Sequence, residues 1–534
     1  MIYRIKAGQN SFVNETRGSL PLRIGEILNS GDKKTGRRGS SARVLPFLAV
    51  SACLAFAGCA VGPNFEKPAA PDVSDYSPHP ATTTDATSNV TGGEAQSFGN
   101  GKEVVGDWWT LFHSKPLNDL IEQSLEKNHD LKSAQAALKV AHENVLAQRG
   151  NFYPNVSAGF SASRHQDPPG ALAPVPSTNA FLYNLFTPQV SVSYMPDVFG
   201  LNRRTVESLQ AQQQQVRYQM IATYNTLTSN VVVAAIQMAS LQMQVDATRE
   251  VIDSNSKVVE ILQYQFKKGV VSGLEVAAQE SQLAQAKAAL PPLLKQLDQE
   301  RDLLAVLCGQ FPSQAPDAKF DLSTMQLPAD LPLSLPSELV AQRPDVLQAQ
   351  EAMHAASAQI GIATANRLPN IQLTGNAGST ALEIGQLFKS GTGFWSLGAD
   401  ITAPIFNGGT LMHQERSAKA AYVQASEQYR GTVLTAFQNV ADTLAALQHD
   451  AEGLKAAAAA ADAAKVTLDL SQRQWRAGVA SYLSLLSAEQ ANQQATINLV
   501  LAQANRYADT AALFQALGGG WWHRAELTQD DDGK

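Results

Sequence analysis

Cysteine is nearly absent from this chain of 534 residues, which contains only Cys53, Cys59 and Cys308. So few thiols exclude a disulfide framework and a zinc site built from clustered cysteines. The nine histidines are scattered, without a His-Glu-x-x-His motif or another paired metal spacing. No glycine-rich phosphate loop leads into Lys-Ser or Lys-Thr, and no serine lies in a nucleophile elbow. The sequence therefore predicts no enzyme, no bound metal and no cofactor.

Aromatic residues and positive charge are also scarce. Aromatics make up 7% of the chain, whereas alanine and glutamine are abundant, which suits long helices with small-residue contacts better than a thick globular core. Residues 1–58 hold nine Lys/Arg and three Asp/Glu, which leaves 41 − 9 = 32 basic and 48 − 3 = 45 acidic residues in the remainder. The resulting excess of 45 − 32 = 13 negative charges argues against a nucleic-acid-binding surface.

The N-terminal region predicts export from the cytoplasm. An apolar run from Val44 to Ala57 follows three arginines and ends at Gly58-Cys59, the order of a secretory signal. This run is too short to cross a bilayer core of about 30 Å as a helix. We therefore interpret residues 1–58 as a signal segment, and residues 1–36 as either an extended n-region or the product of a misassigned start.

The end of this segment, Phe56-Ala57-Gly58-Cys59, resembles a bacterial lipobox. That resemblance implies that Cys59 becomes the lipidated first residue of the mature protein. Ala60 follows the cysteine where an aspartate would signal retention in the inner membrane, so the implied address is the outer membrane. The alternative is an ordinary export signal with an incidental cysteine.

The rest of the chain is a duplication, which is clearest at two short turns. Gln265-Phe266-Lys267-Lys268-Gly269-Val270 recurs as Gln474-Trp475-Arg476-Ala477-Gly478-Val479, an offset of 478 − 269 = 209 residues. An apolar ladder with a period of seven leads into each turn. Its rungs are Val231, Met238, Val245, Ile252, Val259 and Phe266 in the first copy, and Val440, Leu447, Leu454, Ala461, Leu468 and Trp475 in the second. A strict heptad repeat is typical of helices packed as coiled coils.

Each ladder predicts a long helix that turns back at its glycine. We expect these helices from Leu201 to Phe266 and from Gly409 to Trp475, each on the order of 100 Å long at 1.5 Å per residue. Return helices are expected from Gly273 to Leu307 and from Tyr482 to Leu517. Pro291-Pro292 occurs only in the first return helix, where it predicts a kink.

Two pairs of segments alternate apolar and polar residues with the period of a β-strand. They span residues 154–163 and 187–196 in the first copy, and 369–378 and 393–405 in the second. Each is about ten residues long, the length of a tilted strand that crosses a membrane with one face to lipid and one to a lumen. Taken alone, they favour ordinary half-buried hairpins over membrane strands. Four strands cannot close a barrel, so transmembrane strands would have to be pooled by sister subunits, and three copies would supply twelve.

These patterns predict a mainly α protein with a small β part, built from a duplicated strand pair and long coiled-coil helices. A helix is also expected between Trp109 and Arg149, and residues 66–103 are predicted as an extended tether rather than a packed element. The expected order is a signal segment (1–58), a lipidated tether (59–105), a first repeat with its tip at 269–272 (106–310), a linker (311–335), a second repeat with its tip at 478–481 (336–520) and an acidic tail (521–534).

Several motifs spread over most of residues 54–520 carry a family resemblance. They are Phe56-Ala57-Gly58-Cys59-Ala60-Val61-Gly62-Pro63-Asn64-Phe65, Asp107-Trp108-Trp109-x-x-Phe112, Gly269-Val270-Val271-Ser272, Pro291-Pro292-Leu293, Leu304-Ala305-Val306-Leu307-Cys308-Gly309 and Leu335-Pro336-Ser337-Glu338-Leu339-Val340-x-x-Arg343-Pro344-Asp345. The chain resembles TolC/OprM-type outer-membrane efflux channels, in the lipoprotein branch called NodT-like. The resemblance implies a homotrimer whose periplasmic α-helical barrel joins a twelve-stranded transmembrane β-barrel. It also implies a passive exit duct for drugs or other small molecules, with a periplasmic adaptor, an inner-membrane transporter of the RND type and outer-membrane lipid as partners.

The resemblance also implies two candidate sites. The tips that would meet adaptor hairpins consist of Gly269, Val270 and Ser272, together with Gly478, Val479 and Ser481. A simple helix-hairpin turn is the plainer interpretation of both. Asp469 matches the position of an acidic ring that closes the periplasmic aperture, and its counterpart by the 209-residue offset is Glu260. Solvated charges on the outer face are the alternative for this candidate gate.

Two other functions remain open at this point. A type I protein-secretion duct would belong to the same class of outer-membrane channel. A periplasmic coiled-coil adaptor or scaffold lipoprotein would also show heptads and a lipidated cysteine, but it would not carry matched strand pairs in both repeats.

Overall fold

The long helices form two hairpins whose limits repeat with a constant offset. A computed structural model describes residues 60–528 except 79, 81, 167, 169–181 and 317–318, so the signal segment and Cys59 lie outside the described residues. The hairpins are α4 (Leu201–Lys267) with α5 (Gly273–Leu307), and α8 (Thr410–Arg476) with α9 (Tyr482–Ala516). Their starts and ends differ by 209 residues throughout, as 410 − 201 and 516 − 307 both give. The predicted long and return helices are confirmed.

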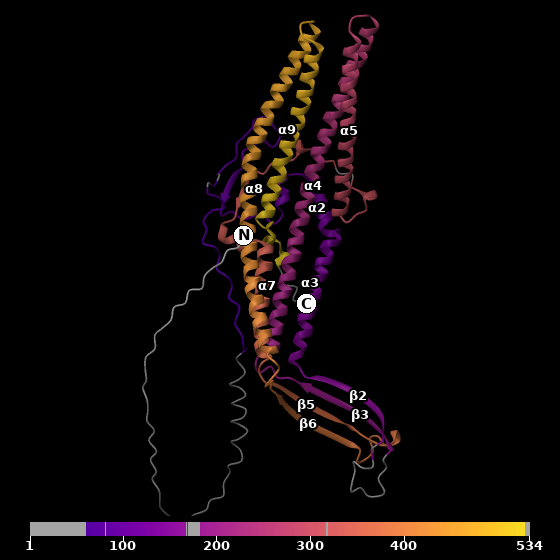
Figure 1. The fold of residues 1–534 in the computed structure, drawn as a ribbon, viewed down its shortest axis with the longest axis vertical. Coiled ribbons are helices and arrows are strands. Elements are labelled where there is room, and N and C mark those ends of the chain that lie inside the picture. The colour runs from indigo at the N-terminus through magenta and orange to yellow at the C-terminus, as the bar shows by residue number, and fades with distance from the viewer. Residues whose placement is uncertain are drawn as a thin grey trace, which may run out of the picture. The chain divides into compact units, whose positions relative to one another are not determined.

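The four helices lie in a row in the order α8, α9, α4, α5 (Figure 1). Val231 and Val245 of α4, like Val440 and Leu447 of α8, have no exposed surface, because the heptad ladders face the neighbouring helices. Phe266 is an exception, since it lies at the end of its helix and is exposed. The helix α5 continues through Pro291 and Pro292. No helix in the described part of the chain has both the length and the hydropathy to span a membrane.

The single helix expected between Trp109 and Arg149 is in fact two helices. A 3-10 turn, η1 (Trp108–Phe112), precedes α2 (Lys115–Lys127) and α3 (His129–Arg149). The chain breaks at Asn128, whose side-chain oxygen accepts hydrogen bonds from the backbone N–H groups of Asp130 and Leu131, at 2.9 and 3.0 Å. Such an N-cap starts a new helix. The second repeat divides in the same way, into α6 (Pro336–Gln342) and α7 (Pro344–Ala365).

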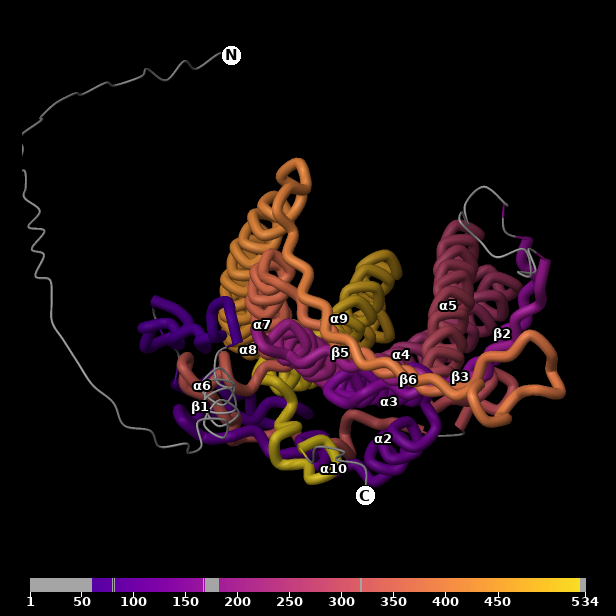
Figure 2. Tube along the Cα trace, turned by 90° about the horizontal axis from the view of Figure 1, so that it is seen from below, coloured from indigo at the N-terminus to yellow at the C-terminus, as the bar shows by residue number. Residues whose placement is uncertain are grey.

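One four-stranded antiparallel sheet combines both predicted strand pairs in the order β2-β3-β5-β6. The strands are β2 (Asn155–Gln166), β3 (Leu182–Tyr194), β5 (Asn370–Ser379) and β6 (Gly393–Thr402). They extend away from the ends of the helices (Figures 1 and 2). Both β2 and β3 reach further toward their connecting loop than predicted, whereas β6 stops short of the predicted end at 405. The pairing of β3 with β5 joins the two repeats within one chain.

The prediction that residues 66–103 form an unpacked tether is wrong for their C-terminal part. Residues Ser97–Asn100 form β1, which pairs in parallel with β4 (Asp330–Leu333) inside the predicted linker. Next to it, Arg506 of α9 is fully buried, and its Nη2 donates hydrogen bonds to the Glu94 backbone oxygen, Thr84 Oγ1 and Gln96 Oε1. Because a buried guanidinium needs acceptors, these contacts hold the segment against the helix.

The segment that begins at Ala60 is also packed. Val61 donates its N–H to the Phe199 oxygen at 3.1 Å. The buried Arg204 donates to the oxygens of Val61 and Gly62 and to Asn64 Oδ1. A Cβ on Gly62 would lie 2.4 Å from the Cα of Gly361, so glycine permits this close approach. Residues 60–64 are thereby fixed at the end of α4 nearest the sheet.

The main core surrounds the middle of α4 and the C-terminal half of α9, together with η1, α2 and the loop residues around Leu322. Trp108 stacks on Phe514 with ring centroids 5.1 Å apart. After α9, the short elements η7 (Trp521–His523) and α10 (Ala525–Thr528) follow. Trp521 is buried and donates its Nε1–H to the Gln342 oxygen at 2.7 Å. The described part of the predicted acidic tail therefore packs against the body.

Candidate functional site

Both hairpins turn at a glycine with a left-handed backbone. Gly269 has φ 72° and Gly478 has φ 70°. Val270 donates its N–H to the Gln265 oxygen, and Val479 donates to the Gln474 oxygen, both at 3.0 Å. This is the bonding that ends a helix on a left-handed residue. No atom lies within 4 Å of an added Cβ at either glycine, so the backbone angle is what favours glycine here.

The serine after each turn begins the return helix, but the two caps differ. Ser481 Oγ accepts a hydrogen bond from the Ser484 N–H at 3.2 Å, as an N-cap does. In the first copy Glu275 makes the main contact, because its carboxylate accepts the Ser272 N–H at 2.7 Å and the Ser272 hydroxyl at 3.2 Å. Both return helices are therefore capped at this serine, with the carboxylate of Glu275 dominant in the first.

The tips present a matched apolar surface. Val270 and Leu274 on the first tip, and Val479 and Leu483 on the second, are each at least 68% exposed. Leu274 and Leu483 were not predicted from the sequence as tip residues, although the 209-residue offset relates them. The available signal was a leucine in the first turn of each return helix, outside the heptad ladder. Exposed apolar groups repeated at both tips are typical of a surface that contacts a partner.

The candidate gate residues lie on different hairpins. Glu260 is exposed on α4 and Asp469 is exposed on α8, on either side of α9 in the row (Figure 1). Asp469 pairs with Arg473 one turn later, with Nη2 and Oδ2 2.6 Å apart. Both partners are more than half exposed, so the pair contributes at most about 1 kcal/mol. The structure does not bring Glu260 and Asp469 into contact, and the gate stays a prediction.

A polar seam below the tips connects the two hairpins and was not predicted. Tyr482 of α9 donates its hydroxyl to Gln279 Oε1 of α5, and Gln279 Nε2 donates to Asn255 Oδ1 of α4 at 3.1 Å. Gln279 and Asn255 are buried. Glutamines and asparagines occur throughout these helices, so the sequence did not single out Gln279 and Asn255 as the pair that meets Tyr482.

A cavity of about 260 Å³ adjoins this seam, and Asn255 and Glu489 are among the residues that line it. Burial raises the pKa of Glu489 to about 6. The described residues contain no group of three or more His, Cys, Asp or Glu side chains that could hold a metal ion.

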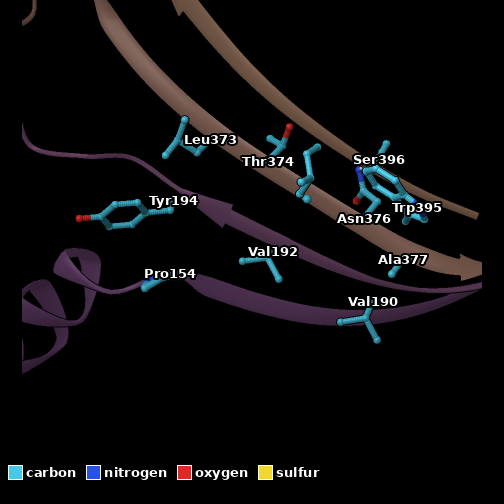
Figure 3. A pocket seen from close by; sticks show the side chains of 12 residues that line it. Pro154, Val190, Val192, Tyr194, Leu373, Thr374, Asn376, Ala377, Trp395 and Ser396 are labelled. Carbon is cyan, nitrogen blue, oxygen red and sulfur yellow. Dashed lines mark hydrogen bonds between the residues drawn. The ribbon is translucent and has the colours of Figure 1, made fainter. Parts of the chain in front are cut away.

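The sheet has two faces of opposite polarity. On one face, cross-strand partners are apolar, as with Val156 opposite Val192 and Ala377 opposite Trp395. A hollow of about 490 Å³ on this face is lined by Val190, Val192, Leu373, Leu397 and other residues (Figure 3). The other face pairs Ser157 with Ser191, Ser191 with Asn376, and Asn376 with Ser396. The predicted period of two is thus realised across all four strands.

Within the described residues, the outer edges of β2 and β6 have no strand partner. The apolar face is also exposed, with Leu397 81% accessible. A water-soluble protein normally covers both features, because free edges and apolar patches promote association. Long helical hairpins that carry a two-faced sheet with open edges define a subunit of an outer-membrane channel.

Comparisons with known proteins agree with this class. The family model described as "Outer membrane efflux protein" matches residues 120–310 and 335–519. The toluene efflux pump outer membrane protein TtgC of Pseudomonas putida is 30% identical over 89% of this chain and 96% of its own length. The antibiotic efflux pump outer membrane protein ArpC of Pseudomonas putida has the same identity and coverage. The solved structure of the outer-membrane channel OprN superimposes with a TM-score of 0.75 at 26% identity, covering 87% of this chain and all of that one.

The chain belongs to the outer membrane efflux protein family. The predictions of that family, of a mainly helical fold with a small β part, of an outer-membrane location and of a role in efflux are confirmed. Family membership also excludes the periplasmic adaptor or scaffold that the sequence left open.

Proposed function

We propose that three copies of this chain form a passive exit duct of a tripartite efflux pump. The duct receives small molecules from an inner-membrane transporter of the RND type and a periplasmic adaptor, and releases them outside the cell. A covalent lipid on Cys59 would add a second attachment to the outer membrane.

The observation that carries this proposal is the two-faced sheet with two open edges. Backbone groups at an open edge cannot be left unpaired in lipid, so β2 and β6 must pair with strands of other subunits. One chain supplies four strands and known single-chain barrels begin at eight. Three copies give twelve strands, with the apolar faces toward lipid and the serine-rich faces toward the lumen.

The helical row supports the same assembly. Only α8 and α5 lie at the flanks of the row, so each would meet the opposite flank of a neighbouring subunit. Three rows of four helices would continue the wall of the strand barrel into the periplasm. A channel wall of that kind needs a surface at its tips that binds a partner, and it needs a gate. It needs no catalytic residues.

The relatives named for toluene and antibiotic efflux favour small-molecule cargo. A protein-secretion duct is the second candidate, since it would need the same wall. The substrate itself would be selected largely by the transporter, so a test of cargo requires the whole pump.

The docking role of the tips can be tested in cells that depend on this chain for drug efflux. Gly269→Val and Gly478→Val should abolish resistance. The left-handed backbone at these positions excludes a β-branched residue, so the substitution changes the turn and displaces the apolar tip. Gly453→Val makes the same chemical change on α8, where the backbone is helical and no atom lies within 4 Å of an added Cβ.

The measurements are the minimum inhibitory concentration of a drug and the amount of trimer in the outer membrane. Gly453→Val should keep resistance. Unchanged resistance in both tip variants at normal trimer abundance would reject the docking role, whereas loss of trimer would point to a folding defect.

The gate can be tested by conductance across a planar bilayer. Asp469→Ala and Glu260→Ala should raise the frequency of openings and weaken block by divalent cations, because a ring of carboxylates binds cations and restricts the aperture. Asp442→Ala, at an exposed position on α8, is the control. No change in openings or in cation block would instead assign both carboxylates to the solvated outer face.

A further inference from the structure

The loop between β5 and β6, residues 380–392, carries large apolar side chains on its surface. Leu382, Ile384 and Phe388 are 53%, 65% and 77% exposed. The loop lies at the end of the strands farthest from the helices (Figures 1 and 2). Loops that face water are usually built from small and polar residues, and several exposed apolar groups in one loop indicate a contact surface.

Phe388 occupies a strained backbone conformation. Its φ is 65°, a left-handed value that is an outlier for a bulky residue. Its N–H donates a hydrogen bond to Ser379 Oγ at 3.1 Å, and Ser379 Oγ donates to Thr392 Oγ1 at 2.8 Å. Ser379 is buried and is the last residue of β5, so these two bonds attach the loop to the end of the strand. Strain that the surrounding structure maintains in this way points to a role for the residue.

The remainder of the loop is held by its own backbone. Gln386 donates its N–H to the Glu383 oxygen at 3.0 Å, Lys389 donates to the Gln386 oxygen at 3.2 Å, and Thr380 donates to the Thr392 oxygen at 2.8 Å. The loop therefore holds Ile384 and Phe388 in a defined place outside the strands.

The loop also continues the apolar face of the sheet. Ala381 and Phe186 exchange backbone hydrogen bonds of 3.0 and 2.9 Å, which attaches the start of the loop to β3. Phe186 pairs with Ala162 on the apolar face, and Trp395 near the start of β6 is exposed on the same face. Glu383 and Lys389 flank the apolar residues of the loop and are exposed. Apolar groups bordered by charges and a tryptophan are typical of the boundary between acyl chains and headgroups.

We propose that residues 380–392 form a wedge that inserts Ile384 and Phe388 among the acyl chains of the outer membrane. This wedge rests on the proposed function, in which the sheet crosses the membrane with its apolar face to lipid. It adds an attachment at the outer end of the sheet, whereas residues 60–64 are fixed at the other end of the sheet, where α4 begins. The occupant is lipid because the loop is continuous with the apolar face, and within the described part of the chain Phe388 stays largely exposed.

The test uses nitroxide labels on single cysteines in the assembled protein, with Cys308→Ala to remove the buried native thiol. The protein is reconstituted in vesicles of phosphatidylethanolamine and phosphatidylglycerol. Labels replace Ile384, Phe388, Lys389, Leu397 and, on the opposite face of β6, Ser396. Collision with oxygen reports acyl chains, and collision with a water-soluble nickel chelate reports water.

Labels at 384 and 388 should resemble the label at Leu397, with high oxygen and low nickel collision, while Lys389 and Ser396 show the reverse. High nickel collision at 388 would place the loop in water at the mouth of the duct. Low collision with both reagents would place it against a neighbouring subunit. Either result overturns the wedge. If Leu397 and Ser396 themselves fail to differ, the proposed membrane sheet fails instead.

If a nitroxide label prevents assembly of the protein, a second measurement uses tryptophan fluorescence instead. Phe388→Trp should be quenched by phospholipids brominated on their acyl chains more strongly than Lys389→Trp, after subtraction of the signal from the native tryptophans. Equal quenching of the two variants contradicts insertion.

Discussion

The helices α4 and α8 have the same length and the same ladder, yet their environments differ. Each is 67 residues long, but 27 residues of α4 are buried and only nine of α8. The return helices show the opposite difference in burial, with six buried residues in α5 and 15 in α9. Duplication therefore produced two equal hairpins, and the row placed one helix of each at its centre. The difference in burial reflects position in the row rather than local sequence pattern.

The two repeats also differ in chemistry where α8 meets α9. Asp450 of α8 corresponds to Leu241 of α4 by the offset, since 450 − 209 gives 241, and Leu241 is buried. Burial, followed by a hydrogen bond with Asp509 of α9, raises the pKa of Asp450 to about 7. The central helix of the first repeat thus carries a buried leucine at the position where the flanking helix of the second carries a carboxyl with a raised pKa.

The largest effect should come from the exposed side of α8. Leu434 is 73% exposed, and Val423 lies eleven residues earlier on the same side of the helix and is also exposed. Leu434→Asp should abolish the trimer without unfolding the subunit, because the substitution places a charge in the surface that we assign to a neighbour. Asn439→Asp, at an exposed polar position on a different side of the helix, should leave the trimer intact. The check is the mass of the detergent-solubilised complex by light scattering; if Leu434→Asp is still trimeric, α8 does not lie in the interface.

A smaller effect is expected at Asp450, and its sign depends on pH. The pKa of Asp450 is raised from an ordinary 3.8 to about 7 in the folded protein, so folding favours the protonated carboxyl. Its contribution to stability is present below pH 3.8 and is lost as the pH rises through about 7. Asp450→Asn removes this loss, and should make the protein about 1–2 kcal/mol more stable than the wild type at pH 8, after allowance for solvent screening of a half-buried group.

The measurement for Asp450→Asn is the urea unfolding midpoint at pH 5 and pH 8, with Asp442→Asn as an exposed control on α8. The gain should be larger at pH 8 than at pH 5, where the unfolded carboxyl is ionised and the folded one is still mostly protonated, and it should appear only in the Asp450 variant. The same gain at both pH values would show that the effect is packing rather than ionisation.

The smallest effect is expected from substitutions of the serines that begin the return helices, and it should differ between the two tips. Ser481→Ala should destabilise the first turn of α9 by about 1 kcal/mol or less, because it removes the N-cap bond to Ser484. Ser272→Ala should cost less, since the Glu275 carboxylate still accepts the backbone N–H of residue 272. Amide hydrogen exchange in the first turns of α5 and α9 measures both. Equal acceleration in the two variants would contradict the difference between the caps.

The repeat made much of the fold predictable. Because the heptad ladders and glycine turns are local patterns, they located the long helices to within a residue or two. Period-two alternation likewise located the four strands, although it missed the outer end of β2, where polar and charged residues such as Arg164 and His165 interrupt the alternation. The break at Asn128 was missed because helical residues stand on both sides, and only the capping bonds end the helix there.

The parts that could not be predicted depend on contacts between distant segments. Nothing local to Ser97–Asn100 indicates a strand, which forms because Asp330–Leu333 lies beside it. Arg506 is buried only because Glu94 and Gln96 supply acceptors more than 400 residues earlier in the chain. At the tips, the glycines were visible as turn residues, whereas Leu274 and Leu483 were hidden as ordinary helical leucines. The candidate gate depends on a threefold axis that one chain cannot define.

The clamp of Arg204 on residues 61–64 also sets an order of events during maturation. The groups that receive this segment come from Phe199, Arg204 and Gly361, which leave the ribosome and cross the inner membrane long after residues 60–64. An enzyme that cleaves or modifies the chain at Cys59 needs the adjoining residues extended in its own active site. On the proposed lipidation of Cys59, processing would be completed while α4 and α7 are still unfolded or absent, and docking of residues 60–64 would then mark a subunit that is ready to assemble.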